Sequence, residues 1–318
     1  MKFEDLRNVV EDTIEAYQRD PEIIPELIWY QANFNRYTFK NTMSIHVQNR
    51  YATHVASQQE WRKQGYSVKR GEKGLYIWAP VISKSFVRPD GDRVGISNAT
   101  DQEKRDIAIG NIPTKDTIAY RLGRVFDISQ TTCPLDDYPR FYNRGYQNFD
   151  HRQLFDSLRI FAEKSQFRVG FADAHSVGLG GYYNPGTNEI TLSNQLKDTR
   201  KLSALCHELS LGLLTKTSTQ PTTVKEFEAE GLSVMLLHQL GLPAGEEHQQ
   251  TITQCYQRID QTTYSLESSF DRMQKAFQFT VRGLQTEIAR IPTEETVPFR
   301  QQQEAQRNIN ANFMLDMD

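Results

Sequence analysis

The sequence predicts an α+β protein with two domains, and three observations support this prediction. The first is an uneven charge: residues 36–124 hold 16 Lys and Arg against 8 Asp and Glu, a balance of +8 that leaves −11 for the rest of a chain whose net charge is −3. The second is a cluster of Pro134, Pro139 and Gly145, which is typical of a linker. The third is a helical motif of zinc peptidases that begins at His207.

The composition fits an ordinary globular chain. Of its 318 residues, 38% are hydrophobic and 24% are charged, and this length suits about two domains. We expect a first domain over residues 1–132, a linker over 133–147, a second domain over 148–292 and a polar tail over 293–318.

Cellular location is predicted from what the sequence lacks. Its three scattered cysteines form neither a disulfide framework nor a CxxC metal spacing. No apolar run approaches the roughly eighteen residues that a membrane span needs, and the N-terminus has no apolar signal region. We therefore predict a cytoplasmic protein with no membrane partner.

The first domain is expected to open with helices. Residues 1–35 predict one or two helices that are interrupted near Pro21 and Pro25. Further on, residues 83–113 contain few apolar side chains and are expected to form an exposed excursion between two strands. The charged tract over 101–106 could instead form a short helix within this excursion.

Aromatic and cationic side chains alternate over residues 61–80, where the basic part of the chain is densest. Cations that follow phosphates and rings that stack on unpaired bases are the combination that binds single-stranded nucleic acid. Gly71 and Gly74 are expected to form the turn into a strand. An equally weighted alternative makes Trp61 and Trp78 core residues beneath a solvated basic loop.

The second domain is predicted to begin with a helix around 151–165, followed by a hairpin over 177–193 with an Asn-Pro-Gly turn. Small metallopeptidases use such an edge strand to hold an extended peptide, here at Gly181, Tyr182 and Tyr183, although a plain structural hairpin explains the pattern equally well. Near the C-terminus, the apolar spacing over 264–281 predicts a long amphipathic helix.

Residues 207–211 read HELSL, which is the H-E-x-x-H motif with a leucine in place of the second histidine. Two histidines four residues apart on a helix can reach one Zn²⁺, and the glutamate between them acts on the metal-bound water. His207 is thus a metal-ligand candidate and Glu208 a general-base candidate, while Leu211 has no donor atom. Apolar residues at helical spacing predict a helix over about 199–214.

Glu226 and Glu230 are four residues apart on the next predicted helix. In gluzincin-like peptidases this spacing supplies a third zinc ligand, here Glu226, and then an acid that hydrogen-bonds a ligating histidine, here Glu230. The alternative is a solvated helix face. Because neither Cys206 nor His238 can reach the position of the missing histidine, we expect no tightly bound cofactor, and zinc only if the site is functional.

Several short motifs of the first domain occur together with a familiar order and spacing. They are Arg36-Tyr37-Thr38-Phe39-Lys40-Asn41-Thr42, Tyr51-Ala52-Thr53-His54-Val55-Ala56, Trp61, Gly65, Val68-Lys69, Gly71-Glu72-Lys73-Gly74, Ala79-Pro80 and Val125-Phe126-Asp127-Ile128-Ser129-Gln130-Thr131. In these motifs the segment resembles the N-terminal single-stranded-DNA-binding domain of the ArdC-type antirestriction proteins and the related LtrC-like proteins. That family continues into a zincin-type metallopeptidase domain, and the motifs of the second domain follow in the same order.

The resemblance implies a single-stranded-DNA-binding module followed by a zincin-like domain of minimal gluzincin type with additional C-terminal helices. It gives the following candidates for contact with DNA: Asn41, Trp61, Arg62, Lys63, Lys69, Arg70, Lys73 and Tyr76. For peptidase activity the resemblance holds only in part, because Leu211 leaves the ligand set incomplete.

The preferred hypothesis is a single-stranded-DNA-binding protein of a plasmid, integrative element or phage, of antirestriction or DNA-protection type, with a degenerate metallopeptidase domain. A rival hypothesis is an active zinc endopeptidase that acts on a host defence protein. A third is a non-catalytic peptide-binding or scaffold protein. The expected partners are single-stranded DNA and a host or element-encoded protein.

Overall fold

The computed structural model describes residues 3–138, 141, 146, 149–173, 180–242 and 244–291. Helices and sheets are both present, which confirms the predicted α+β class. The chain forms two compact units, Met1–Arg144 with Ile259–Asp271 and Gly145–Arg258 with Arg272–Asp318. Residues 259–271 thus pack with the first unit, whereas the sequence places them in the second domain. The predicted tail over 293–318 lies outside the described residues.

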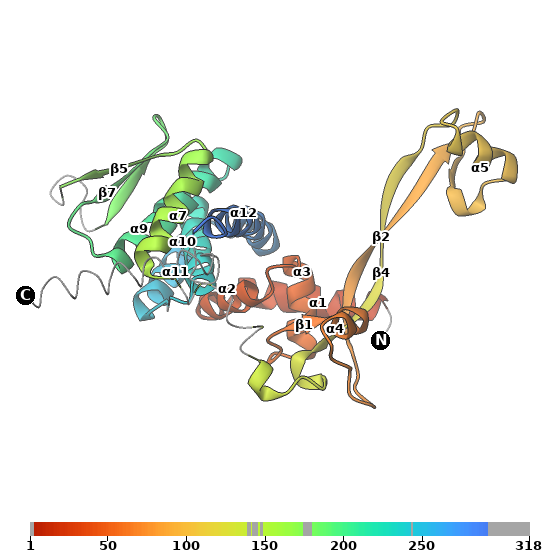
Figure 1. The fold of residues 1–318 in the computed structure, drawn as a ribbon, viewed down its shortest axis with the longest axis horizontal. Helices are drawn as coiled ribbons and strands as arrows, with labels where there is room; N and C mark the ends of the chain where they lie inside the picture. Colours follow the sequence, from red (N-terminus) through yellow and green to blue (C-terminus); the bar gives the residue numbers. More distant parts are fainter. Residues whose placement is uncertain are drawn as a thin grey trace, which may run out of the picture. The chain divides into compact units, whose positions relative to one another are not determined.

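Short helices form the start of the first unit (Figure 1). They are α1 (Phe3–Gln18), η1 (Pro21–Ile23), α2 (Ile24–Asn33), α3 (Phe39–Gln48) and α4 (Gln58–Lys63). The predicted interruption near the two prolines is present, because Pro21 opens η1 and Pro25 lies in the first turn of α2. A proline is tolerated at these positions since the first helical N–H groups have no partner within the helix.

The sheet of the first unit has the order β1-β4-β2-β3, with every pair antiparallel. Its strands are β1 (Val55–Ala56), β2 (Leu75–Val87), β3 (Arg93–Gly95) and β4 (Lys115–Asp127). Strands β2 and β4 pair continuously from Leu75↔Val125 to Ser85↔Lys115. They run side by side as a long ribbon that carries α5 at its far end (Figure 1).

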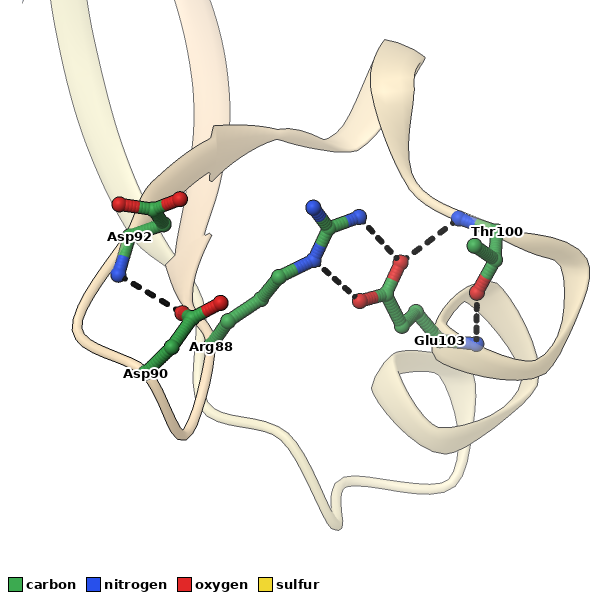
Figure 2. A network of polar contacts seen from close by, with 5 residues as sticks. All are labelled: Arg88, Asp90, Asp92, Thr100 and Glu103. Atoms are coloured by element: carbon green, nitrogen blue, oxygen red, sulfur yellow. Dashed lines mark hydrogen bonds and ion pairs between the residues drawn. The ribbon is translucent and has the colours of Figure 1, made fainter.

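The predicted excursion is a folded tip on this ribbon. It contains β3, η2 (Ile96–Asn98) and α5 (Asp101–Ala108), so the charged tract forms the short helix given as the alternative. The guanidinium of Arg88 donates to both carboxylate oxygens of Glu103, at 2.7 and 3.1 Å, and Thr100 caps α5 (Figure 2). The bonds from Arg88 and then from the Thr100 backbone lower the pKa of Glu103 to about 2.

The core of the first unit continues into part of the predicted linker. After β4 the chain forms η3 (Ile128–Gln130) and η4 (Leu135–Asp137). Cys133 is buried in a cluster with Trp61, and the ring of Phe141 packs against that tryptophan with ring centroids 5.4 Å apart. Part of the segment 133–147 is therefore packed onto the first unit, because Cys133 and Phe141 lie in the cluster around Trp61.

The second unit combines a small sheet with helices (Figure 1). Its elements are α7 (His151–Lys164), β5 (Arg168–Ala172), β6 (Gly181–Asn184), β7 (Glu189–Ser193), α9 (Asp198–Thr217), α10 (Thr222–Gln239) and α11 (Glu246–Gln257). The sheet order is β5-β7-β6, with β5 parallel to β7 and β6 antiparallel to it. Strand β6 is therefore an edge strand, and α9 follows the hairpin as predicted.

The last described helix is α12 (Leu266–Ile288), which agrees with the long amphipathic helix predicted over 264–281. Its buried residues recur at helical spacing, among them Phe270, Met273 and Phe277. Among the described residues, no helix combines the length and the apolar composition needed to cross a membrane.

Candidate functional site

Asn41 has a structural role in the first unit. Its side-chain amide donates to the carbonyl of Trp78 at 3.1 Å and accepts from the Trp78 N–H at 2.8 Å. Helix α3 is thereby fastened to the edge of β2. Both polar groups of its amide are therefore paired with backbone, and the predicted contact of Asn41 with DNA stays a prediction.

Trp61 departs from its predicted role. The side chain is 0% exposed, and its indole N–H donates to the carbonyl of Phe126 at 2.9 Å. A ring that is closed off from solvent cannot stack on a base, so the prediction of a DNA contact is wrong for Trp61. Trp78 is buried as well, at 7% exposure, and the core-residue alternative holds for both.

The remaining basic candidates lie on the surface of the first unit. Five of them are exposed: Arg62, Lys63, Lys69, Arg70 and Lys73. The loop that carries the last three is held in place, because Gln130 donates to the carbonyl of Lys73 at 2.9 Å and Lys69 donates to the carbonyl of Ser129 at 2.9 Å. Gly71 has a φ of +90°, the left-handed conformation that glycine adopts without strain. The loop therefore presents its cations on a defined surface.

Tyr76 is half-buried at the start of the ribbon, and its neighbour across the strands was not predicted. Arg124 lies opposite Tyr76, with its guanidinium carbon 5.2 Å from the ring centroid and a 3.1 Å bond to the hydroxyl. Three further exposed ribbon cations were also missed: Lys84, Lys115 and Arg121. Their placement depends on strand register, which the sequence pattern does not give.

One pocket of about 360 Å³ brings together every candidate of the second unit. It is lined by residues of β6, α9, α10 and α11, which include Gly181, Tyr182, Tyr183, His207, Glu208, Leu211, Glu226, Glu230, Thr251 and Cys255. The backbone N–H of Tyr183 donates to Glu208. Burial, the largest cause, raises the pKa of Glu208 above its ordinary value.

Glu230 is the most deeply buried carboxylate of this pocket, with 6% of its side chain exposed. It accepts from the Nδ1 atom of His207 at 2.9 Å and from that of His248 at 2.6 Å. Burial opposes its ionisation, but the bonds from the two imidazoles outweigh burial and lower the pKa of Glu230 to about 2. Burial is the largest single influence on His207 and lowers its pKa, but the bond and charge of Glu230 outweigh it and raise the pKa above its ordinary value. The bond to Glu230 likewise raises the pKa of His248.

The pocket lacks one of the donor atoms that the zinc motif requires. Leu211 lines the pocket at the position where the motif requires a histidine. Within the part of the chain that the structure describes, no group of three or more His, Cys, Asp or Glu side chains is arranged to hold a metal ion. The ligand role of Glu226 and the supporting role of Glu230 therefore stay predictions.

Helix α11 contributes residues that the sequence analysis missed. Thr251 and Cys255 line the pocket, and His248 binds Glu230 from the same helix. These three positions follow one another at intervals of three and four residues, which places them on one helix face. The sequence spacing could have predicted this shared helix face, but it does not indicate which element the face packs against.

Comparison with known proteins gives one family and one relative. The profile of the family described as the N-terminal domain of anti-restriction factor ArdC matches residues 4–117. An uncharacterized protein of Bacillus anthracis, pXO2-81, is 26% identical over 253 residues, which make up 73% of this chain and 43% of the relative. The chain therefore spans less than half of that relative's length.

Two crystal structures of the antirestriction protein ArdC from plasmid R388 are also similar. The match to the metal-free structure covers 81% of this chain and 87% of the ArdC chain, with 14% identity and a TM-score of 0.45. The match to the Mn(II)-bound structure covers 80% of this chain and 90% of the ArdC chain, with 14% identity and a TM-score of 0.42. Residues 4–117, less than half of the chain, thus match the N-terminal domain of the ArdC family, as the motifs of the first domain predict.

Proposed function

We propose that the first unit binds single-stranded DNA through the exposed cations of the loop over residues 62–73 and of the β2–β4 ribbon. The observation that carries this proposal is that Arg62, Arg70 and Lys73 are exposed and belong to no ion pair among the described residues. Cations without a protein partner are free to neutralise phosphates, and the release of counterions then drives binding.

The proposed biological role is antirestriction, or another form of DNA protection, for a plasmid, integrative element or phage. It is supported by the family of the first domain, whose description names an anti-restriction factor. In this role the protein acts in the cytoplasm on single-stranded DNA. A host or element-encoded protein is a second partner, which the pocket of the second unit would contact.

A charge-neutralising variant tests the DNA-binding proposal. Replacing Arg62, Arg70 and Lys73 with Gln should weaken binding to an oligo(dT) strand. It should also reduce the slope of log K against log salt by about 2, since each phosphate contact on a single strand contributes about 0.7. The matched control removes the same charge from the ribbon tip by changing Arg93, Lys104 and Arg105 to Gln. An equal loss in both variants would show that binding follows net charge rather than this surface.

A second proposal concerns the pocket, which we infer is a degenerate peptidase site that holds an extended peptide along β6 without hydrolysing it. It is supported by the position of β6 at the sheet edge beside the pocket, since an edge strand can pair with an added peptide strand. The Tyr183 N–H already donates to Glu208, so a bound peptide would pair with the other backbone groups of this edge. Leu211 argues against the alternative, an active zinc endopeptidase. Glu208→Gln separates the two hypotheses. A non-catalytic peptide-binding site should keep its function in this variant, whereas an active peptidase should lose all hydrolysis.

A further inference from the structure

The middle of the β2–β4 ribbon exposes apolar side chains on one face. Ile82 lies directly opposite Ile118, and Pro80 lies opposite Tyr120. Side chains two residues apart on a strand share a face, so these four side chains lie together on one face. Ile82, Ile118 and Tyr120 are 68%, 60% and 61% exposed. We call these three residues the ribbon patch.

The ribbon patch is unusual because its three large apolar side chains are more than half exposed. Near its start the same face is covered, since Trp78 packs edge-on against Phe3 and lies beneath Lys40. From Val81 to Lys84 in β2 and from Lys115 to Arg121 in β4 the described side chains are mostly exposed, and burial resumes at Ser85 and Phe86 towards the tip. A two-stranded ribbon without a packed face is marginally stable in water, and a cluster of large exposed apolar residues marks a binding surface.

Cations frame the ribbon patch. Lys84 follows Ile82 on the same face, and at the other end Arg124 lies over the ring of Tyr76, again on this face. Lys115 and Arg121 are an odd number of residues away from Ile118 and Tyr120 along β4, so their side chains lie on the opposite face of the ribbon. Against these four cations the paired stretch carries one acidic residue, Asp116, which lies directly opposite Lys84 on the patch face. The charge therefore favours a polyanion with apolar faces over an ordinary protein surface.

We propose that the ribbon patch is a stacking platform for unpaired bases, with the flanking cations holding the phosphates. This inference rests on the proposed function of the first unit. It identifies the surface that distinguishes single-stranded DNA from duplex DNA. Unpaired bases present faces that stack on aromatic and apolar side chains, whereas in a duplex those faces are already stacked on one another. A strand that passes along the ribbon over the patch would meet Lys84 at one end and Arg124 at the other, so both cations could face its backbone.

The test separates stacking from charge. Tyr120→Ala should weaken binding to oligo(dT) about fivefold or more, with the salt slope unchanged, because no cation is removed. Tyr120→Phe should bind like the unaltered protein, because the ring is kept. Lys84→Gln should instead lower the slope by about 0.7. The full chain is used throughout, and thermal unfolding checks that each exposed-site variant stays folded.

Matched controls come from equally exposed residues of the same unit. Tyr51 is 82% exposed and Ile109 is 70% exposed, and both lie outside the ribbon patch. Tyr51→Ala and Ile109→Ala should leave affinity unchanged, whereas Ile118→Ala should lower it. The proposal is overturned if the Tyr120 and Ile118 variants bind oligo(dT) as well as the controls do. It is also overturned if they lose affinity equally for duplex, which would indicate groove or phosphate contact.

These outcomes are distinct from failure of the proposed function. If the unaltered protein does not bind oligo(dT) at any salt concentration, the proposed function itself fails. If the unaltered protein binds oligo(dT) and the patch variants bind it with the same affinity, the DNA-binding proposal is kept and the stacking-platform proposal is rejected. Self-association that is lost in Ile118→Ala, with DNA binding intact, would assign the patch to a second copy of the chain and likewise overturn the platform.

Discussion

The Nδ1 atom of His207 donates to Glu230 at 2.9 Å, and this one bond ties the first residue of the HELSL motif to the helix that follows it. In metal sites such a bond fixes the ring so that its other nitrogen can take the metal. The pocket contains a bond of this kind, although Leu211 has no donor atom at the second position of the motif. In addition, His248 binds the other oxygen of Glu230 at 2.6 Å, so the carboxylate is held from two sides.

Restoring the missing donor tests whether the rest of the site has kept its arrangement. Leu211→His should raise zinc content from a small fraction to near-stoichiometric, because His207 and Glu226 would then be joined by a third ligand. Metal content of the purified protein is measured by mass spectrometry, with Leu211→Ala as the control. A histidine variant that takes up no more zinc than the alanine variant would show that the backbone geometry has drifted as well.

Glu230 should matter for stability whether or not a metal binds. Glu230→Gln leaves two imidazoles without their carboxylate and should lower the free energy of unfolding by about 2–3 kcal/mol. This loss is smaller than the loss expected when one partner of a fully buried ion pair is removed, because the side chains of His207 and His248 are 39% and 28% exposed. Urea unfolding measures the change. Glu226→Gln, at an exposed position, is the control, and equal midpoints for the two variants would contradict the buried network.

His46 should make the first unit less stable in mild acid. Burial, followed by the charge of Arg50, lowers the pKa of this imidazole below its ordinary value of 6.5, with Glu26 acting weakly in the opposite direction. As the pH falls below 6.5, the unfolded chain takes up a proton that the folded state resists. The stabilisation is therefore present above pH 6.5 and is lost as the pH falls towards the folded pKa. His46→Gln should flatten this dependence in unfolding curves at pH 7.5 and 5.5, and identical pH profiles would sink the prediction.

The ribbon tip should depend on its helix cap. Thr100 accepts the N–H of Glu103 while the Glu103 carboxylate accepts the N–H of Thr100, which forms a complete capping box. Thr100→Ala should destabilise α5 by about 1 kcal/mol and speed proteolytic cleavage within residues 88–114. Thr100→Ser, which keeps the hydroxyl, is the control. Unchanged cleavage in the alanine variant would mean that the tip is held by Arg88 alone.

Local patterns predicted the elements well because helix and strand periodicity is written in neighbouring residues. The spacing around His207 predicted a helix over about 199–214, and α9 spans Asp198–Thr217. The four-residue interval between Glu226 and Glu230 likewise placed both on one pocket wall. These predictions required no knowledge of how distant elements pack.

Predictions that depended on packing fared worse. Alternating cations and aromatics did not reveal that Trp61 points into the core, since a tryptophan fits either a core or a stacking site. Nor did the sequence show that α11 would bring His248 to Glu230, a contact across 18 positions in the chain. The ribbon patch was missed for the same reason, because Ile82 and Ile118 become neighbours only through strand register.

Competition between single-stranded and duplex DNA tests the central claim most directly. The affinity of the full chain is measured for oligo(dT) and for a duplex of equal length over a series of salt concentrations. The expected result is tighter binding to the single strand at every salt concentration, with log K falling linearly against log salt. No preference over duplex, or an affinity that does not change with salt, would contradict the account.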